Sequence, residues 1–457
     1  NEADVQALRE IVGPEHIMVG AEIPEDYAHD ELAKERALPD CLVEPGCVEE
    51  ISQIMHYAYE NNLPVTPRGT ATGLCGGCVA THGGILLSTL RLNRILEIDE
   101  ECLMAIVEPG VILLDFQKEV ERRGLFYPPD PGEKSATLGG NVSTNAGGMR
   151  AVKYGVTRDY VRGLEVVLPN GEITEIGGKL SKNSSGYGLL HLFVGSEGTL
   201  GIITKIALRL VPLPKRRVSL LVPFPTLERA ISTVPKVLMT RTSPTAVEFM
   251  QSDVIHAYEK NMGKTFPHSE APAYLLLQFD GNSATELEAA YEAAAEACLA
   301  EGAWDAFIAD TSDRHAAVWD ARGTFLEALK AVSELELADT VVPPHCIPEF
   351  VTFCDALGEK YGVKVLTFGH AGDGNCHIHI MRERLDDEAW QKVYPKVMEE
   401  IYRKGHELGG QVSGEHGIGI AKRDYLHRWV GDVNLELMRG IKAAFDPKGI
   451  LNPGKVV

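Results

Sequence analysis

The chain has 457 residues, and 44 Lys and Arg against 65 Asp and Glu give a formal net charge of −21 at pH 7. Hydrophobic residues make up 44% and charged residues 24%, an ordinary globular composition that excludes disordered, collagen-like and fibrous proteins. The length exceeds what one hydrophobic core supports and indicates two or three domains. The negative charge argues against nucleic acids and anionic membranes as partners, because their phosphates would repel it, and its ordinary explanation is solubility.

The sequence pattern predicts no targeting signal. No run of 18 or more apolar residues predicts a transmembrane segment, and the first residues, Asn1-Glu2-Ala3-Asp4, lack the basic and apolar regions of a secretory signal. The nine cysteines are an odd number without framework spacing, which suits a reducing compartment better than a disulfide scaffold. We therefore expect a cytoplasmic protein.

Helical and alternating patterns divide the first half of the chain into short elements. Apolar residues at helical spacing predict a helix over 47–60, ended by Asn61-Asn62, and Asn170-Gly171 between two β runs is a strong hairpin signal. In chain order we expect the helix 47–60, an extended piece 63–67, a buried strand 84–90, a helix 112–123, a hairpin of 164–168 and 172–176, and an alternating strand 202–210.

The chain changes character after Pro212 and Pro214, which are followed by three basic residues, and we place the main domain boundary there. Beyond it, apolar strands at 274–279 and 363–368 alternate loosely with helices near 285–299 and 387–408. This order predicts an α+β fold in which an antiparallel sheet carries helices on one face. The expected division is 1–212, then 213–400, then a C-terminal helical segment, 401–457, that returns to the first domain.

Three glycine-rich segments, 67–78, 135–148 and 195–201, carry the first chemical signal. Glycines let backbone N–H groups approach an anion closely, and interleaved Thr, Ser and Asn add donors, which together suit a pyrophosphate. No Lys-Ser/Thr closes a P-loop, and no Gly-x-Gly-x-x-Gly opens a helix after a strand, so a Rossmann nicotinamide site is not supported. One such segment would be read as a turn, but three are not easily explained in that way.

These segments resemble those of a known flavoprotein family. Residues 67–77 (PRGTATGLCGG), 138–148 (LGGNVSTNAGG) and 195–204 (GSEGTLGIIT) are similar to the flavin-binding segments of the vanillyl-alcohol oxidase/p-cresol methylhydroxylase (PCMH) superfamily, in its glycolate oxidase/D-lactate dehydrogenase branch. The resemblance implies a two-part, PCMH-type FAD-binding domain over 1–212, a cap domain over 213–400 and one FAD between them. No residue matches a histidine for covalent attachment, so we expect noncovalent FAD, and His82 is read as an ordinary loop residue.

The same resemblance implies a set of FAD-binding residues. They are Pro67, Arg68, Gly69, Thr70, Ala71, Thr72, Gly73, Leu74, Gly76, Gly77, Pro131, Thr137, Gly139, Gly140, Asn141, Ser143, Thr144, Gly147, Gly148, Gly155, Glu197, Gly198, Gly201, Ile202, Ile203 and Asn452.

A second cluster of chemistry-bearing residues lies in the C-terminal half. His377 and His379 alternate on a predicted strand and point the same way, and a Gly-Asp-Gly turn can fold His370 back over them. Two histidines with a carboxylate make a sensible set of ligands for a divalent metal. The family resemblance implies that His370, His377 and Glu415 hold one divalent ion (Zn, Fe or Mn) and that His416 is the base. His379 is a possible fourth ligand or a donor to substrate.

Arg322 is the candidate for holding a substrate carboxylate. Its spacing alone favours a surface ion pair, whereas the resemblance implies the arginine of the cap that binds a 2-hydroxy acid. Cys75 and Cys78 form a C-x-x-C pattern that could indicate a redox pair or half a metal site. We read them as two small side chains near FAD, because no second C-x-x-C exists.

The resemblance implies FAD-dependent oxidation of a small D-2-hydroxy acid, D-lactate first and glycolate second. His416 takes the hydroxyl proton, hydride passes to flavin N5, and the electrons go to a separate acceptor such as an electron-transferring flavoprotein, an Fe–S subunit or a quinone. Three alternatives stay open: a D-2-hydroxyglutarate dehydrogenase, a non-redox enzyme like alkyl-dihydroxyacetone-phosphate synthase, and a non-catalytic flavoprotein subunit. The diacid is disfavoured because Asp339 or a neighbour stands where 2-hydroxyglutarate-type relatives carry Lys.

Overall fold

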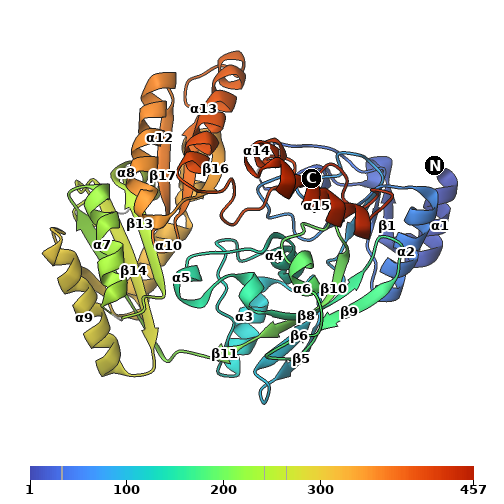
Figure 1. The fold of residues 1–457 in the computed structure, drawn as a ribbon, viewed down its shortest axis with the longest axis horizontal. Helices are drawn as coiled ribbons and strands as arrows, with labels where there is room; N and C mark the ends of the chain where they lie inside the picture. The colour runs from blue at the N-terminus through green and yellow to red at the C-terminus, as the bar shows by residue number, and fades with distance from the viewer. Residues whose placement is uncertain (32–33, 241, 264) are drawn as a thin grey trace. The chain divides into compact units, whose positions relative to one another are not determined.

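The computed structural model describes residues 1–31, 34–240, 242–263 and 265–457, and the chain forms two compact units (Figure 1). The first unit contains residues 1–147, 156–213 and 415–457, and the second contains 148–155 and 214–414. Residues 401–414, which we expected in the C-terminal segment, belong to the second unit. The reason is that Gln411 exchanges two backbone hydrogen bonds with Val341, which ties this stretch to the sheet of that unit.

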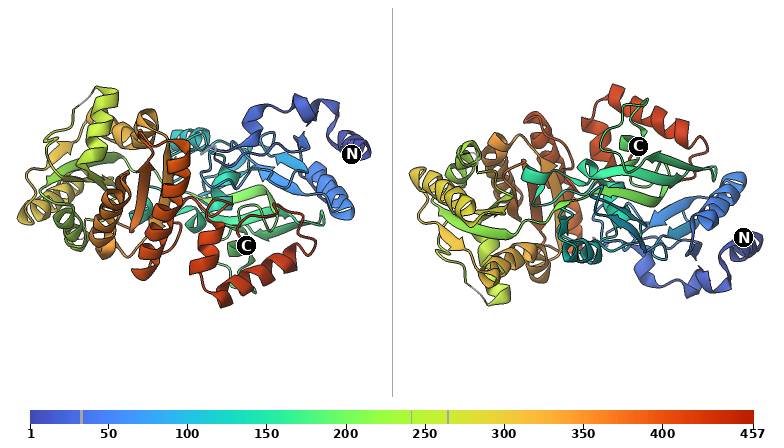
Figure 2. Two further views of the ribbon diagram at one scale, coloured as in Figure 1. Left: turned by 90° about the horizontal axis from the view of Figure 1, so that it is seen from above. Right: turned by 90° about the horizontal axis from the view of Figure 1, so that it is seen from below.

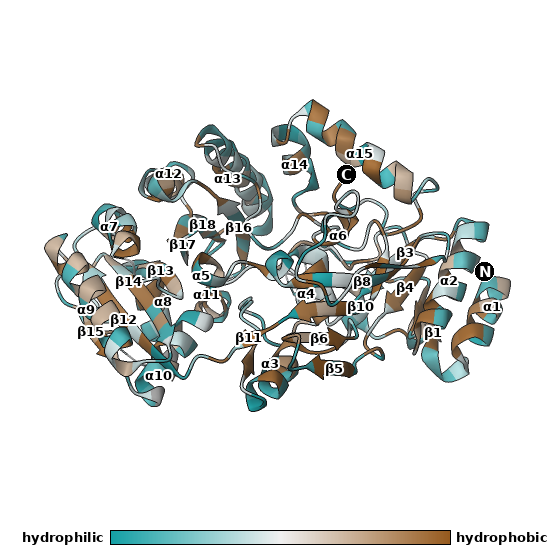
Figure 3. Ribbon diagram, turned by 60° about the horizontal axis from the view of Figure 1, so that its bottom comes forward, coloured by the Kyte–Doolittle hydropathy of each residue, from teal (hydrophilic) through white to brown (hydrophobic). Residues whose placement is uncertain are grey.

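The described residues of the first unit form three sheets. A four-stranded sheet has the order β1-β2-β4-β3, in which β2, β4 and β3 run parallel, and a five-stranded antiparallel sheet has the order β5-β6-β10-β8-β9. The strands are β1 (Ile17–Val19), β2 (Cys41–Val43), β3 (Val65–Arg68), β4 (Ile85–Ser88), β5 (Ile95–Asp99), β6 (Met104–Val107), β8 (Val161–Val167), β9 (Ile173–Gly177) and β10 (Ile202–Arg209), with β7 (Leu125–Phe126) and β11 (Val211–Pro212) as a separate pair. Figure 3 shows β4 and β6 as predominantly hydrophobic, in keeping with their burial.

The helices of this unit include α1 (Glu2–Val12), α2 (Val48–Asn61), α3 (Leu113–Arg122), α4 (Leu138–Thr144), α6 (Leu189–Phe193), α14 (Arg423–Trp429) and α15 (Asp432–Phe445), with 3-10 turns η1 (Pro14–His16), η2 (Gly20–Glu22), η3 (Glu25–Ala28) and η4 (Thr157–Asp159). Figure 2 shows the chain from two further directions, with α14 and α15 in red and α1 and α2 in blue. The helix predicted over 47–60 is α2, which buries Ile51, Ile54, Met55 and Ala58 at helical spacing and ends at Asn62 with φ 52°.

The other elements predicted here also form, with one difference. The hairpin is β8 and β9, and Gly171 in its turn has φ 89°, a left-handed conformation that glycine adopts without strain. The glycine-rich segment 135–148, expected as a loop, contains the helix α4. Thr137 caps the helix by accepting a hydrogen bond from the N–H of Gly140, and the side chains of Leu138 and Val142 on the helix are buried. Capping and burial therefore outweigh the low helix propensity of its two glycines.

The second unit is one seven-stranded antiparallel sheet with the order β15-β12-β14-β13-β17-β18-β16. Its strands are β12 (Arg216–Phe224), β13 (Ala246–Gln251), β14 (Ala273–Gly281), β15 (Phe307–Ala309), β16 (Leu335–Val341), β17 (Lys364–His370) and β18 (Asn375–Met381). Its helices are α5 (Ala151–Tyr154), α7 (Leu227–Met239), α8 (Ser252–Met262), α9 (Ala284–Ala300), α10 (Ser312–Gly323), α11 (Phe325–Val332), α12 (Ile347–Tyr361) and α13 (Asp387–Glu407), with the turn η5 (Pro344–Cys346). The strands and helices predicted beyond residue 213 correspond to β14, β17, α9 and α13.

The four long helices α7, α9, α12 and α13 cover one face of this sheet (Figure 1). The opposite face carries a row of polar side chains from β13, β17, β18 and β16, because alternate residues of a strand point to the same side. The candidate cap residues lie on that polar face. Among the described residues, no helix is both long and apolar enough to cross a membrane.

Candidate functional site

The glycine-rich segments of the first unit come together in space. A Cβ added to Gly69 would lie 2.4 Å from Oγ1 of Thr137, and one added to Gly198 would lie 2.5 Å from the ring of Pro67. Backbone hydrogen bonds join the second and third segments, since the N–H of Glu197 donates to the carbonyl of Ser143 over 2.7 Å. The three segments therefore lie against one another, and Gly69 and Gly198 leave too little space for a side chain between them.

Asn452 and Glu197 hold these segments together. The side-chain amide of Asn452 donates to the carbonyls of Gly77 and Glu197, which links the first segment to the third. The Glu197 carboxylate accepts from the N–H groups of Ile418 and Gly419, both at 2.7 Å. Burial raises the pKa of this carboxyl above its usual value, although the two N–H donors oppose the rise. Asn452 and Glu197, both predicted to bind FAD, thus hold the glycine segments in place through hydrogen bonds.

Several polar side chains of the predicted flavin site donate hydrogen bonds to backbone carbonyls of the protein. The guanidinium of Arg68 donates to the carbonyls of Asp26 and His29, and the hydroxyls of Ser143 and Thr144 donate to carbonyls one helical turn earlier. These groups orient backbone, and their protons are not available to a ligand in this conformation.

Two buried polar atoms in the same region have no partner within the described part of the chain. They are Nδ2 of Asn141 and Oδ1 of Asn452. A buried amide atom left without a hydrogen bond is costly, so these atoms favour a polar ligand at this place. Together with a cradle that a Cβ would fill, they fit the phosphates and polar ring edges of FAD.

Glu415 and His416 begin the last segment of the first unit. A Cβ on Gly147, at the end of the second glycine segment, would lie 2.7 Å from Oε2 of Glu415, so this carboxylate lies against that segment. In the chain, both residues directly follow Gly414, whose N–H donates to Asp339 of the second unit over 3.1 Å. Glu415 and His416, the candidate metal ligand and the candidate base, are therefore one and two residues away from a backbone N–H that is hydrogen-bonded to Asp339.

The two histidines predicted as metal ligands meet on the polar face of the second unit. His370 ends β17 and His377 lies on β18, both are buried, and their Nε2 atoms are 3.3 Å apart. Two nitrogens that bind one tetrahedral ion at about 2.1 Å lie roughly 3.4 Å apart. The observed separation fits two nitrogen ligands of a shared ion.

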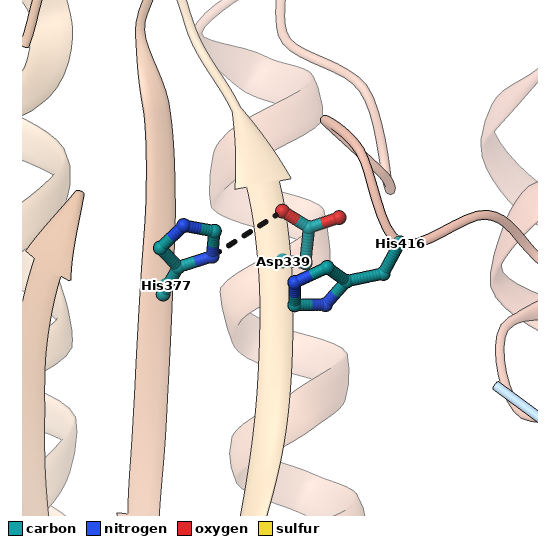
Figure 4. Close-up of side chains that lie close together, drawn as sticks. All are labelled: Asp339, His377 and His416. Atoms are coloured by element: carbon teal, nitrogen blue, oxygen red, sulfur yellow. Dashed lines mark ion pairs between the residues drawn. The ribbon is translucent and has the colours of Figure 1, made fainter. Parts of the chain in front are cut away.

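Each histidine has a carboxylate on its other ring nitrogen. Nδ1 of His370 lies 2.6 Å from Oε1 of Glu248 on β13, and Nδ1 of His377 lies 3.6 Å from Oδ1 of Asp339 on β16 (Figure 4). A carboxylate hydrogen-bonded at this position, as Glu248 is, orients a metal-binding histidine, whereas the 3.6 Å separation at His377 is that of an ion pair. Asp339 also accepts from the amide of Asn375 and the hydroxyl of Ser413, so it holds the neighbouring chain as well.

Arg322 points from α10 over the same face. Its Nη2 lies 2.6 Å from Oε2 of Glu248, and its guanidinium carbon lies 4.5 Å from the ring centre of Phe368. The ion pair is buried, whereas spacing alone favoured a surface pair. Nε of Arg322 is buried and finds no acceptor among the described residues, so the guanidinium retains a donor for a ligand carboxylate.

His379 occupies the position beside the histidine pair on β18. It stacks on Phe368 at 4.7 Å between ring centres, and its Nδ1 contacts the carbonyl of Leu366 at 3.2 Å. The structure thus places His379 on the same polar face as the histidine pair, as the alternation predicted.

The sequence reasoning missed Glu248 as a site residue and assigned Asp339 no role in holding histidines. Glu248 is the single carboxylate of a largely apolar strand, Asp339 shares its strand with Glu336, and the side chains of Glu248 and Asp339 are fully buried. A buried charge needs a partner, so this local pattern could have marked both positions. It could not have identified the partners, which are distant in sequence.

The remaining predicted residues are less informative. Gly148 and Gly155 belong to the second unit, on either side of α5, and Pro131 lies in a turn region before α4. The thiol of Cys75 donates to the carbonyl of Gly417, and burial beside Arg68 leaves the pKa of Cys78 raised to about 11. These are the properties of packed small side chains, and the raised pKa of Cys78 disfavours its thiolate.

Comparisons with known proteins identify both parts of the chain. Residues 39–188 match the FAD binding domain family, and residues 213–456 match the family of FAD linked oxidases, C-terminal domain. The chain is 47% identical to a D-lactate dehydrogenase from Anaerostipes hadrus over 99% of this chain and 96% of that protein. It is 41% identical to the glycolate oxidase subunit GlcD from Bacillus subtilis (strain 168), over 94% and 91%.

More distant matches share the fold and are named for other activities. A D-2-hydroxyglutarate dehydrogenase from Stutzerimonas stutzeri (strain A1501) is 31% identical over 99% of this chain and 98% of its own. The solved structure of p-cresol methylhydroxylase with substrate bound superposes with a TM-score of 0.81 at 19% identity, covering 100% of this chain and 96% of that one. The resemblance to PCMH-type flavoproteins inferred from the glycine segments is confirmed.

Proposed function

The chain belongs to the FAD-linked oxidases, and on that premise we propose that it oxidises a small D-2-hydroxy acid, D-lactate first and glycolate second, to the 2-oxo acid. The supporting observation is the pair of Nε2 atoms 3.3 Å apart beside a buried arginine, because a hydroxy acid presents a hydroxyl and a carboxylate to such a set of groups. The high identity to a D-lactate dehydrogenase and to a glycolate oxidase subunit supports the same substrate class.

We assign FAD, noncovalently bound, to the backbone surface of the first unit. The N–H groups of residues 69–77 and 139–148 would face its pyrophosphate, and Asn141 and Asn452 would use their unpartnered amide atoms on it. When bound, FAD supplies the hydride acceptor for the reaction. The residues of the chain bind it, exclude water from it and leave its reactive edge to substrate.

We assign one divalent ion to His370, His377 and Glu415, each of which offers one ligand atom. Such an ion, when bound, lowers the pKa of a coordinated hydroxyl group. The donor set of two imidazoles and one carboxylate suits Zn, Fe or Mn. His370 is oriented for this by its hydrogen bond to Glu248, Asp339 forms an ion pair with His377, and Glu415 lies against Gly147 at the edge of the flavin segments.

Arg322 and His416 have the remaining roles. Arg322 would bind the substrate carboxylate with donors that Glu248 does not occupy, and its contact with Phe368 fixes the plane of its guanidinium. His416 would accept the hydroxyl proton near neutral pH, since an imidazole is a competent base there. The electrons leave to a separate acceptor, an electron-transferring flavoprotein or an Fe–S subunit.

The competing substrate is a diacid such as D-2-hydroxyglutarate, which the 31% identical relative favours. A second carboxylate would need its own cation, and at the cap position considered for it the structure has Asp339, buried and engaged with Asn375 and Ser413. An unpaired charge in a closed site is costly, so the diacid should react poorly.

Anaerobic flavin reduction tests the proposal. We expect kcat/KM for D-lactate to exceed that for D-2-hydroxyglutarate by at least about tenfold, in the range that a missing polar partner produces. A clear preference for the diacid would show that the cap residues bind substrate differently. Failure of every 2-hydroxy acid to bleach the flavin would instead favour a non-redox enzyme like alkyl-dihydroxyacetone-phosphate synthase.

A further inference from the structure

Glu248 is the one described carboxylate that contacts both the predicted metal ligand and the predicted substrate arginine. Its Oε1 lies 2.6 Å from Nδ1 of His370, and its Oε2 lies 2.6 Å from Nη2 of Arg322. On the sheet, Glu248 stands directly opposite His370 in the register of β13 and β17. The side chain of Glu248 is fully buried, so solvent does not compete for either contact.

The two contacts use both oxygens, Oε2 in an ion pair with Arg322 and Oε1 in a hydrogen bond with His370. Arg322 is donor-only, and a carboxylate is acceptor-only, so their pairing fixes Oε2. The contact at Oε1 then requires the proton of His370 to lie on Nδ1, which leaves the lone pair on Nε2, the atom 3.3 Å from Nε2 of His377. One carboxylate therefore selects the tautomer that a metal ligand needs and also holds the guanidinium.

Resting on the proposed function, we propose that Glu248 is a positioning residue that serves both halves of the site. It keeps Nε2 of His370 available for the ion and holds Arg322 at the place where the substrate carboxylate binds. The reaction needs both the hydroxyl and the carboxylate of one small molecule to be held at the same time. A shared carboxylate fixes the spacing between their two binding groups.

Glu248→Gln separates the two tasks. The amide has the same shape but one acceptor and one donor, so it can satisfy Arg322 or His370 but not both. Arg322 carries a full charge and offers only donors, so the amide oxygen turns toward it. The NH₂ group then faces Nδ1 of His370 and donates to it, which moves the imidazole proton to Nε2 and blocks the ion. The Zn²⁺ affinity should therefore fall more than the binding of the substrate carboxylate by Arg322.

The experiment measures Zn²⁺ affinity of the metal-free, FAD-bound protein by competition with a chromophoric chelator, and then KM and kcat for D-lactate at saturating Zn²⁺. For Glu248→Gln we expect Zn²⁺ affinity to fall about 10–100-fold, the usual cost of losing a residue that orients a metal-binding histidine. KM at saturating metal should change less than the affinity does. Glu248→Ala should lose affinity and also raise KM, and Glu248→Asp should restore part of the affinity.

Glu336→Gln is the matched control. Glu336 is another buried carboxylate on β16, and because it pairs with Ile380 while Leu337 pairs with His379, it points to the opposite face. Its variant should keep wild-type Zn²⁺ affinity and KM. The flavin spectrum of every variant reports on folding.

The outcomes distinguish the inference from the function on which it rests. Wild-type Zn²⁺ affinity in a folded Glu248→Gln protein, with D-lactate still oxidised by the wild type, would overturn the inference alone. An equal loss of affinity in Glu336→Gln would also overturn it, because the effect would then be a general response to a neutralised buried carboxylate. A wild-type protein that takes up no divalent ion would overturn both the metal role in the proposed function and this inference.

Discussion

The glycine segments of the first unit and the polar sheet face of the second unit build binding sites in opposite ways. In the first unit the side chains of Arg68, Ser143 and Thr144 bond to their own backbone, and the surface that we propose for FAD consists of backbone groups. In the second unit charged side chains form a chain of contacts from Arg322 through Glu248 and His370 to His377, with Asp339 beside it. A large, extended cofactor suits the first construction, and a small substrate with two reacting groups suits the second.

Removing one imidazole should abolish metal binding on the polar sheet face and leave FAD binding by the glycine segments unchanged. His377→Ala deletes one of the two Nε2 atoms, so we expect loss of the bound ion and a fall in 2-hydroxy-acid oxidation of at least about 10³-fold, while the FAD spectrum stays unchanged. Metal analysis and anaerobic flavin reduction on the same preparation provide the measurement. Full activity in a metal-free protein would contradict the role of the ion.

His416→Ala tests the residue that follows the metal ligand in the chain. Loss of a positioned general base should slow flavin reduction by roughly 10²–10⁴-fold. Stopped-flow reduction by D-lactate measures the rate, and retained metal content shows that the ion site survives. An unchanged rate in a folded, metal-loaded variant would remove His416 from the mechanism.

Gly198→Ala should damage the first region and leave the second intact. The added Cβ would lie 2.5 Å from the ring of Pro67, at a backbone φ of 68°. We expect FAD affinity to fall by about tenfold, with unchanged Zn²⁺ uptake, because the displaced segment contributes backbone to the cofactor surface. Gly124→Ala is the matched control, since its φ is 74° but its Cβ would meet nothing within 4 Å. Equal FAD loss in both variants would show that backbone strain alone is responsible.

The smallest effect concerns His315, which lies on the same sheet face away from the ion site. Its ring nitrogens contact Ser219 and Gln278, and burial, with Arg217 and Arg150 nearby, lowers its pKa to about 4. The unfolded chain, with a pKa of about 6.5, binds the proton more readily, so folding stability should fall as the pH drops from about 6.5 toward 4, by about 2 kcal/mol. His315→Gln should lose this part of the pH dependence in urea titrations, and a variant with the wild-type dependence would contradict the assignment.

The sequence predicted the parts of the molecule whose signals are local. The spacing of His370 and His377 is set by a single turn between neighbouring strands, and the glycine segments have a composition that few other sites need. Glu248 and Asp339 were not assigned to the histidines because strand pairing, not sequence proximity, brings them there. The helix α4 was missed because its glycines oppose a helix until Thr137 caps it and Leu138 is buried.

The short helix α5 also determines where the chain can be divided into fragments. Residues 148–155 leave the first unit immediately after the glycine segment and pack on the sheet of the second, where Lys153 pairs with Asp280 and the hydroxyl of Tyr154 donates to the same carboxylate over 2.9 Å. The side chain of Asp280 is only 2% exposed. A fragment cut as 214–414 would therefore lack both partners of Asp280 and the segment that covers it, so a cap fragment is expected to need residues 148–155, grafted or supplied as a peptide.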